Sequence, residues 1–156
     1  MSEDKLKAIL ARARNEVEQD VIAKEEAKRR VVDLWQRRAD ILKDVVLPRL
    51  QAAKEAWKDT VELNIHEQTA YNASLPDRSP LISFHLGKFN PNNPGIGGSL
   101  MYVFTITESG AFHIYEGETV KNSLDLRVGL KGESLDEKII DNVLEIAAKD
   151  YFRRNS

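Results

Sequence analysis

The sequence predicts an α+β protein in which a long N-terminal helix is followed by a mainly antiparallel five-stranded sheet with a C-terminal helix packed on it. Three observations predict this class. Residues 3–47 contain no Gly or Pro and are rich in helix-favouring residues. Residues 61–130 contain five short segments of alternating apolar and polar residues, as strands do. Helical spacing returns over 135–153. We therefore expect a helical arm over 1–58 and a small α+β domain over 59–156.

The apolar residues of the arm recur at steps of three and four, which places them on one side of a helix. This stripe contains Leu6, Leu10, Ala13, Val17, Val21, Val31, Trp35, Ala39, Leu42, Val46, Ala53 and Trp57. Lys24 and Lys28 fall on the stripe and interrupt it. The spacing is closer to an 11-residue repeat than to a heptad, which predicts a nearly straight or slightly right-handed assembly. Pro48 is predicted to end or kink the helix near Leu47.

The length of the stripe predicts a partner. A helix of roughly 45 residues spans roughly 68 Å, whereas a compact body of about 100 residues has a radius of gyration near ~13 Å. One small domain cannot cover such a stripe, and no turn residues mark a hairpin, although the stripe is polar over 18–30. We therefore predict that another chain covers it, in a homo-oligomer or a larger assembly. The expected contact residues are Leu6, Leu10, Val17, Val21, Val31, Trp35, Leu42 and Val46.

The second half of the chain supplies the expected sheet and the final helix. The alternating segments are 61–66, 82–86, 100–106, 112–114 and 124–130. The third has apolar residues on both faces, as a strand covered on both sides does. Glycines 110 and 117 lie in short gaps that predict antiparallel hairpins. Ser134, with Glu137 three residues later, predicts a capping box at the start of the last helix.

Histidines provide the first candidate site. His66, His85 and His113 lie on three predicted strands, each on the face opposite to the apolar residues of its strand. If these strands are neighbours, the imidazoles converge and are able to bind zinc with an open position, or an anion when protonated. The alternative is an ordinary solvated sheet face, because the order of the strands does not follow from the sequence.

A glycine-rich loop over 88–99 provides the second candidate. Its contact candidates are Lys88, Asn92, Asn93, Gly95, Gly97 and Gly98. Backbone N–H groups of such loops bind phosphates, but a phosphate loop normally leads into a helix, and here a strand is expected. A connection between strands is the simpler interpretation. Long loops are also frequent binding surfaces, so a partner or ligand contact is expected here first.

Charge and composition narrow the classes of function. Residues 28–30 and 37–38 are basic, but acids four residues before them form the ion pairs of a solvated helix. Residues 1–58 hold 14 basic and 11 acidic residues, so nucleic-acid binding by the arm is an alternative that is not favoured. The chain has no cysteine and shows no signal peptide or membrane span. We expect a cytoplasmic protein with no membrane partner.

The function predicted from these features is protein–protein interaction or assembly rather than catalysis. The arm is expected to mediate oligomerisation or docking, and the α+β head to bind a partner. No cofactor is expected, because no nucleophile, nucleotide or metalloprotease motif occurs. The alternative is a head that binds a small molecule or metal, with or without catalysis, through the polar sheet face or the 88–99 loop.

Overall fold

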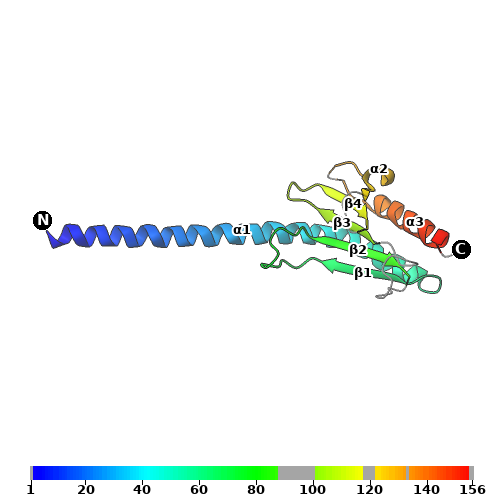
Figure 1. Ribbon diagram of the computed structural model, residues 1–156, viewed down its shortest axis with the longest axis horizontal. Coiled ribbons are helices and arrows are strands. Elements are labelled where there is room, and N and C mark those ends of the chain that lie inside the picture. The colour runs from blue at the N-terminus through cyan, green and yellow to red at the C-terminus, as the bar shows by residue number, and fades with distance from the viewer. Residues whose placement is uncertain (1, 88–100, 118–121, 133, 155–156) are drawn as a thin grey trace. The chain divides into compact units, whose positions relative to one another are not determined.

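The computed structural model describes residues 2–87, 101–117, 122–132 and 134–154. In chain order the elements are α1 (Glu3–Trp57), β1 (Leu63–Gln68), β2 (Leu81–Leu86), β3 (Tyr102–Ile106), β4 (Phe112–Glu116), α2 (Asp125–Val128) and α3 (Glu137–Arg154), as labelled in Figure 1. The α+β class with a long first helix and a C-terminal helix is confirmed. Contacts group the chain into unit 1, Met1–Leu34, and unit 2, Trp35–Ser156. The second half of α1 thus belongs with the sheet, whereas the sequence placed the boundary after residue 58.

The sheet corrects one prediction, because the described residues form four strands and not five. The strands are antiparallel in the order β1-β2-β3-β4. The predicted fifth strand over 124–130 is the short helix α2 with its flanking residues. Leu124 and Val128, four residues apart, are buried, whereas Leu126 between them is 96% exposed. Apolar residues four apart share one side of a strand and also of a helix, so the sequence pattern fitted both.

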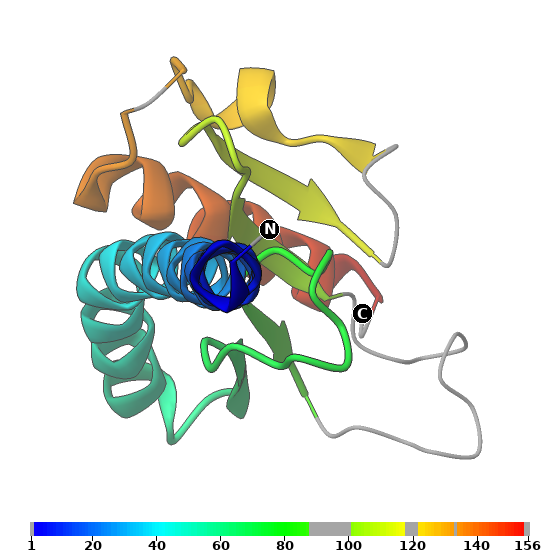
Figure 2. The ribbon, with the colours of Figure 1, turned by 90° about the vertical axis from the view of Figure 1, so that its left-hand side faces the viewer.

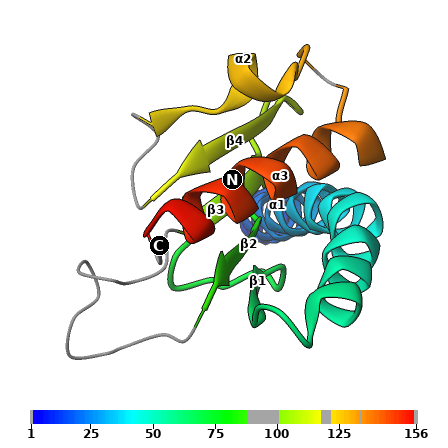
Figure 3. The ribbon, with the colours of Figure 1, turned by 90° about the vertical axis from the view of Figure 1, so that its right-hand side faces the viewer.

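The core of unit 2 lies between one face of the sheet and the helices. Cross-strand pairs such as Phe84–Tyr102 and Phe104–Ile114 place aromatic and aliphatic side chains on that face. The second half of α1 contributes Leu42, Val46, Leu50 and Ala53 to the same cluster, and α3 contributes Ile139, Ile140, Val143, Leu144 and Ala147. Figures 2 and 3 show these turns of α1 next to α3. The hydrophobic driving force therefore comes from two helices that share one sheet face.

Pro48 bends α1 without ending it. The helix continues from Glu3 to Trp57 with the proline inside it. In Figures 2 and 3 the last turns of α1 run at an angle to the turns of unit 2 that precede them. A proline lacks an N–H donor and crowds the carbonyl of the preceding turn, which bends a helix. The kink predicted from the sequence is therefore present.

Polar contacts fix α3 against the rest of unit 2. Arg49 of α1 donates two parallel hydrogen bonds to Asp141 at 2.6 and 2.9 Å, and it forms an ion pair with Glu137 at 2.8 Å. The bonds to Asp141 raise the pKa of Arg49 above its ordinary value. Tyr102 of β3, only 2% exposed, donates its hydroxyl hydrogen to Asp150 at 2.8 Å. Burial and this bond raise the pKa of Tyr102.

The start of α3 differs in detail from the prediction. The carboxylate of Asp136 accepts a hydrogen bond from the backbone N–H of Ile139 at 2.9 Å, so Asp136 caps the helix. Ser134 instead forms a backbone bridge with Lys131. The predicted Ser134 cap is therefore two residues too early, because an acid closer to the helix satisfies the same free N–H groups. The hairpin predicted at Gly110 is confirmed between β3 and β4, where its φ is 86°.

Candidate functional site

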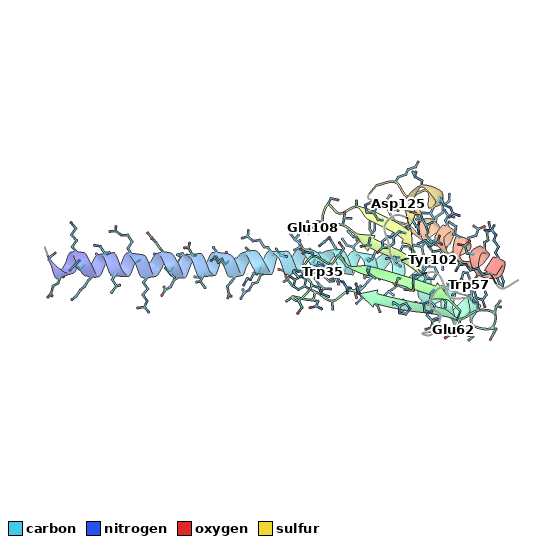
Figure 4. All side chains as sticks on the ribbon, in the orientation of Figure 1. Trp35, Trp57, Glu62, Tyr102, Glu108 and Asp125 are labelled. Carbon is cyan, nitrogen blue, oxygen red and sulfur yellow. The ribbon has the colours of Figure 1, made fainter. Side chains whose placement is uncertain are left out.

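Unit 1 is a helix whose apolar side chains are exposed. Leu6, Leu10, Val17 and Val21 are 55%, 72%, 62% and 54% exposed, and Val31 is 54% exposed. We call these five residues the association stripe. Figure 4 shows the side chains of this helix extending from its surface. A single helix has no second element against which to bury an apolar side, so the stripe is a surface that another protein is able to cover.

The predicted contact residues farther along α1 have a different environment. Trp35 is 5% exposed, and Leu42 and Val46 are fully buried in unit 2. The indole N–H of Trp35 donates to the carbonyl of Arg78 in the connection between β1 and β2, and the indole packs edge-on against Tyr71. These three residues belong to the core of unit 2. Of the eight residues predicted to contact a partner, the five of the association stripe are therefore the exposed ones.

Two of the three histidines meet on the sheet. His66 of β1 and His85 of β2 project from the face opposite to the core, and the Nε2 atom of His66 lies 2.9 Å from Nδ1 of His85. Their rings stack at a centroid distance of 5.0 Å. His85 is 2% exposed, and its burial, together with the neighbouring His66, lowers its pKa. Glu62 acts in the opposite direction on this pKa. In this contact one of the two facing ring nitrogens donates the hydrogen bond and the other accepts it.

His113 lies elsewhere on the sheet. It is on β4, and β3 separates its strand from that of His85. Its Nδ1 atom lies 2.9 Å from Asp125, whose other carboxylate oxygen accepts the backbone N–H of Ile114 at 2.7 Å. Asp125, labelled in Figure 4, thus joins the first turn of α2 to β4. The contact with Asp125 holds His113, and the intervening strand β3 separates His113 from the other two imidazoles.

The described residues bear on the metal hypothesis and leave the loop hypothesis a prediction. Within residues 2–87, 101–117, 122–132 and 134–154, no group of three or more His, Asp or Glu side chains is placed to hold a metal ion. A zinc site needs at least three protein ligands. The predicted loop contacts, Lys88 to Gly98, lie outside the described residues. The face predicted to be polar is buried at its centre, where Ser83 and Val103 are 3% and 6% exposed.

The basic residues of α1 have mixed environments. Residues 28–30 are exposed in unit 1. Arg38, in unit 2, is half-buried and donates to the backbone carbonyl of Ile106 at 3.3 Å. Unit 1 holds eight Lys and Arg and eight Asp and Glu, so its charges cancel. A phosphate backbone is bound mainly by an excess of positive charge, which this helix lacks.

Sequence reasoning missed a groove between the last turns of α1 and α3. It has a volume of about 500 Å³, and Ala52, Ala56 and Ala148 are among the small residues that line it. Arg49 and Asp141 also border the groove, and they are bonded to each other. The groove therefore offers mainly apolar contact. Small residues four apart on α1 were its only signal in the sequence.

Comparison of the chain with protein-family models, with curated proteins and with solved structures finds no match. Among the described residues, no helix has the length and apolar character that crossing a lipid bilayer requires. The function proposed below therefore rests on the geometry and charge of the chain itself.

Proposed function

We propose that this chain is an assembly protein that associates through the helix of unit 1. The observation that carries this proposal is the exposure of the association stripe. Each of its five apolar residues is more than half exposed. The same side of α1 is covered by the protein's own core from Trp35 onward. An apolar side that is buried in one half of a helix and bare in the other favours a second protein as its cover.

The stability of unit 1 supports the same proposal. Helices in proteins gain most of their stability from packing of an apolar side, and isolated helices are marginal in water. Within residues 2–34, the ion pair that the helix forms is Arg14–Glu18, four residues apart at 3.2 Å, with side chains 81% and 60% exposed. Such a pair contributes only a few tenths of a kcal/mol. A partner helix would supply the burial that these surface contacts cannot.

Charge favours a protein partner over nucleic acid. The eight basic and eight acidic residues of unit 1 give it no net charge. Binding to a nucleic acid would require an excess of cations and would weaken steeply with salt. A helix with balanced charges and an apolar stripe instead suits another helix of similar composition. The separate role expected for residues 59–156, binding a partner of their own, stays a prediction.

Analytical ultracentrifugation of the full chain tests the proposal. The variant Leu10→Glu/Val17→Glu places two charges in the association stripe. The control Ala8→Glu/Gln19→Glu adds the same two residues on the opposite side of the helix, where both positions are exposed. We expect the wild type and the control to associate as concentration rises, and the stripe variant to remain monomeric, because buried unpaired carboxylates are costly.

Two results would contradict this function. A wild type that stays monomeric to several hundred micromolar would remove self-association. Equal association of the stripe variant and the control would show that the stripe is not the contact surface. Circular dichroism of each variant would verify that α1 remains helical, so that a loss of association reports the surface and not unfolding.

A further inference from the structure

We propose that the partner of unit 1 is unit 1 of a second copy, packed antiparallel in one register. In this register two residues lie level when their numbers add to about 32. The inference rests on the proposed function and specifies it further. It follows from the exposed stripe of unit 1 and from the order of charges beside that stripe.

The repeat of the stripe disfavours a parallel pair. Leu6, Val17 and Lys28 are eleven residues apart, as are Leu10 and Val21, so each set forms a row along the helix. Lys28 therefore stands in an apolar row, as does Lys24 in a third row beside it. In a parallel pair in register, each residue meets its own copy. Both lysines would then face like charges across the contact, which is unfavourable.

An antiparallel pair separates these lysines. With a sum of 32, Leu6 lies level with the interval between Lys24 and Lys28 of the other copy, where the lysine stems cover it and the ammonium groups reach water. The middle of the contact is formed by Leu10, Val17 and Val21 of both copies, which are three of the five residues of the association stripe.

Charged residues beside the stripe select the register. Glu3, Arg14 and Glu25 form one row, eleven residues apart, and Lys7, Glu18 and Arg29 form a second row on the same side of the stripe. A twofold axis perpendicular to two antiparallel helices brings the same flank of each helix together. A sum of 32 then places opposite charges level in every case: Glu3 with Arg29, Lys7 with Glu25, and Arg14 with Glu18.

The two neighbouring registers place like charges level with each other. A shift by one repeat gives a sum of 21, which places Glu3 level with Glu18 and Lys7 level with Arg14. A shift the other way gives a sum of 43, which also pairs like charges, Arg14 with Arg29 and Glu18 with Glu25. Like charges at such contacts suppress the wrong arrangement. On the other flank, at the favoured sum, Glu16 is level with its own copy, while Asp20 is level with Arg12.

The register also uses most of unit 1. Glu3, where α1 begins, is level with Arg29 of the other copy, and unit 1 ends at Leu34. The overlap over residues 3–29 is therefore about 27 residues, or about 40 Å at 1.5 Å per residue. The charged side chains that would pair are accessible, because residues 3–31 of the helix are exposed. Arg14 and Glu18 pair with each other within one copy at 3.2 Å, and their side chains are still 81% and 60% exposed.

Cysteine cross-linking of the full chain tests the arrangement, because the natural sequence contains no cysteine. In the proposed register, Leu10 of one copy and Val21 of the other differ by one residue in level, about 1.5 Å. Two copies of Leu10 are about 18 Å apart along the axis, and two copies of Val21 about 15 Å. A disulfide needs Cα atoms within about 7 Å. Val17 of one copy lies close to Val17 of the other in both a parallel and an antiparallel pair.

Oxidation of an equimolar mixture of Leu10→Cys and size-tagged Val21→Cys should give the mixed dimer as the main product. Each variant alone should give little dimer, and Val17→Cys alone should cross-link readily as the positive control. Self-cross-linking of Leu10→Cys and of Val21→Cys without the mixed product would overturn the antiparallel register and leave the proposed function standing. No cross-linking in any variant, Val17→Cys included, would overturn both.

Charge exchange provides a second measurement that keeps the apolar stripe intact. Lys7→Glu or Glu25→Lys alone places like charges level in the pair and should weaken association about threefold to tenfold. The double variant restores the opposite charges between copies and should return the dissociation constant close to that of the wild type. In-chain neighbours of both positions are unchanged, so restoration reports the contact between copies. A double variant at least as weak as the product of the singles would contradict the register.

Discussion

The division of α1 between two units predicts that one substitution has opposite consequences in its two halves. Leu42 and Leu10 lie on the same side of the helix, but Leu42 is fully buried in unit 2 and Leu10 is 72% exposed in unit 1. Replacing each by alanine removes the same atoms and keeps a good helix former. The difference between the two variants therefore measures tertiary packing and not helix propensity.

The magnitude follows from burial. Leu→Ala in a core costs about 2–5 kcal/mol, since apolar contact is lost and a cavity remains. We take about 3 kcal/mol for Leu42, because its side chain is enclosed by the helix and sheet cluster. With a urea m-value of about 1.5 kcal/mol/M, the unfolding midpoint should fall by about 2 M. Leu10→Ala should change the free energy of unfolding of unit 2 by less than about 0.5 kcal/mol.

Tryptophan fluorescence is a suitable signal because both tryptophans of the chain, Trp35 and Trp57, lie in unit 2 (Figure 4). Urea titrations of the dilute protein would follow the unfolding of this unit. Equal shifts for the two alanine variants would refute the reasoning, since they would mean that Leu10 supports the core as much as Leu42 does. An unchanged midpoint for Leu42→Ala would refute it equally.

Three further predictions concern polar groups of unit 2. The pKa of His85 is lower in the folded protein than the ordinary value of 6.5, so the unfolded chain binds the proton more readily and stability should fall as the pH drops below about 6.5; urea midpoints at pH 7.5 and 5.5 should differ more for the wild type than for His85→Gln. Tyr102→Phe removes the bond to Asp150 and should lower the free energy of unfolding by about 1 kcal/mol, which thermal denaturation would detect; no change would contradict this. Arg49→Lys should lower the urea midpoint, because an ammonium cannot make the two parallel bonds to Asp141, and a midpoint equal to that of the wild type would argue against the bidentate contact.

Much of the fold followed from local patterns. The run without Gly or Pro predicted α1, the period of two predicted β1 to β4, and apolar spacing predicted α3, all of which the structure contains. The residue pattern predicted the wrong element where a strand and a helix satisfy the same apolar spacing. Leu124 and Val128 fit a strand or a helical turn, and packing against α3 and β4 decides for the helix. The sequence pattern placed the N-cap of α3 at Ser134. Asp136, two residues later, is an equally acceptable hydrogen-bond acceptor, and it is the residue that caps the helix.

The candidate sites show the same limit. Alternation placed His66, His85 and His113 on the face opposite to the apolar residues of their strands, but the order of the strands decides which of them meet. With β3 between them, His85 pairs with His66 and His113 pairs with Asp125. Contacts between helices, such as Arg49 with Asp141, connect residues 92 positions apart, and no local pattern signals them.

The sequence by itself determined the helical character of residues 3–57 and the apolar side along them, interrupted at Lys24 and Lys28, because both depend on neighbours three and four positions away. Only the tertiary structure decided where that side is covered. Packing against the sheet and α3 buries it from Trp35 onward and leaves the association stripe exposed. The physical reason is that burial depends on which distant segments share a core, which residue spacing along one helix does not encode.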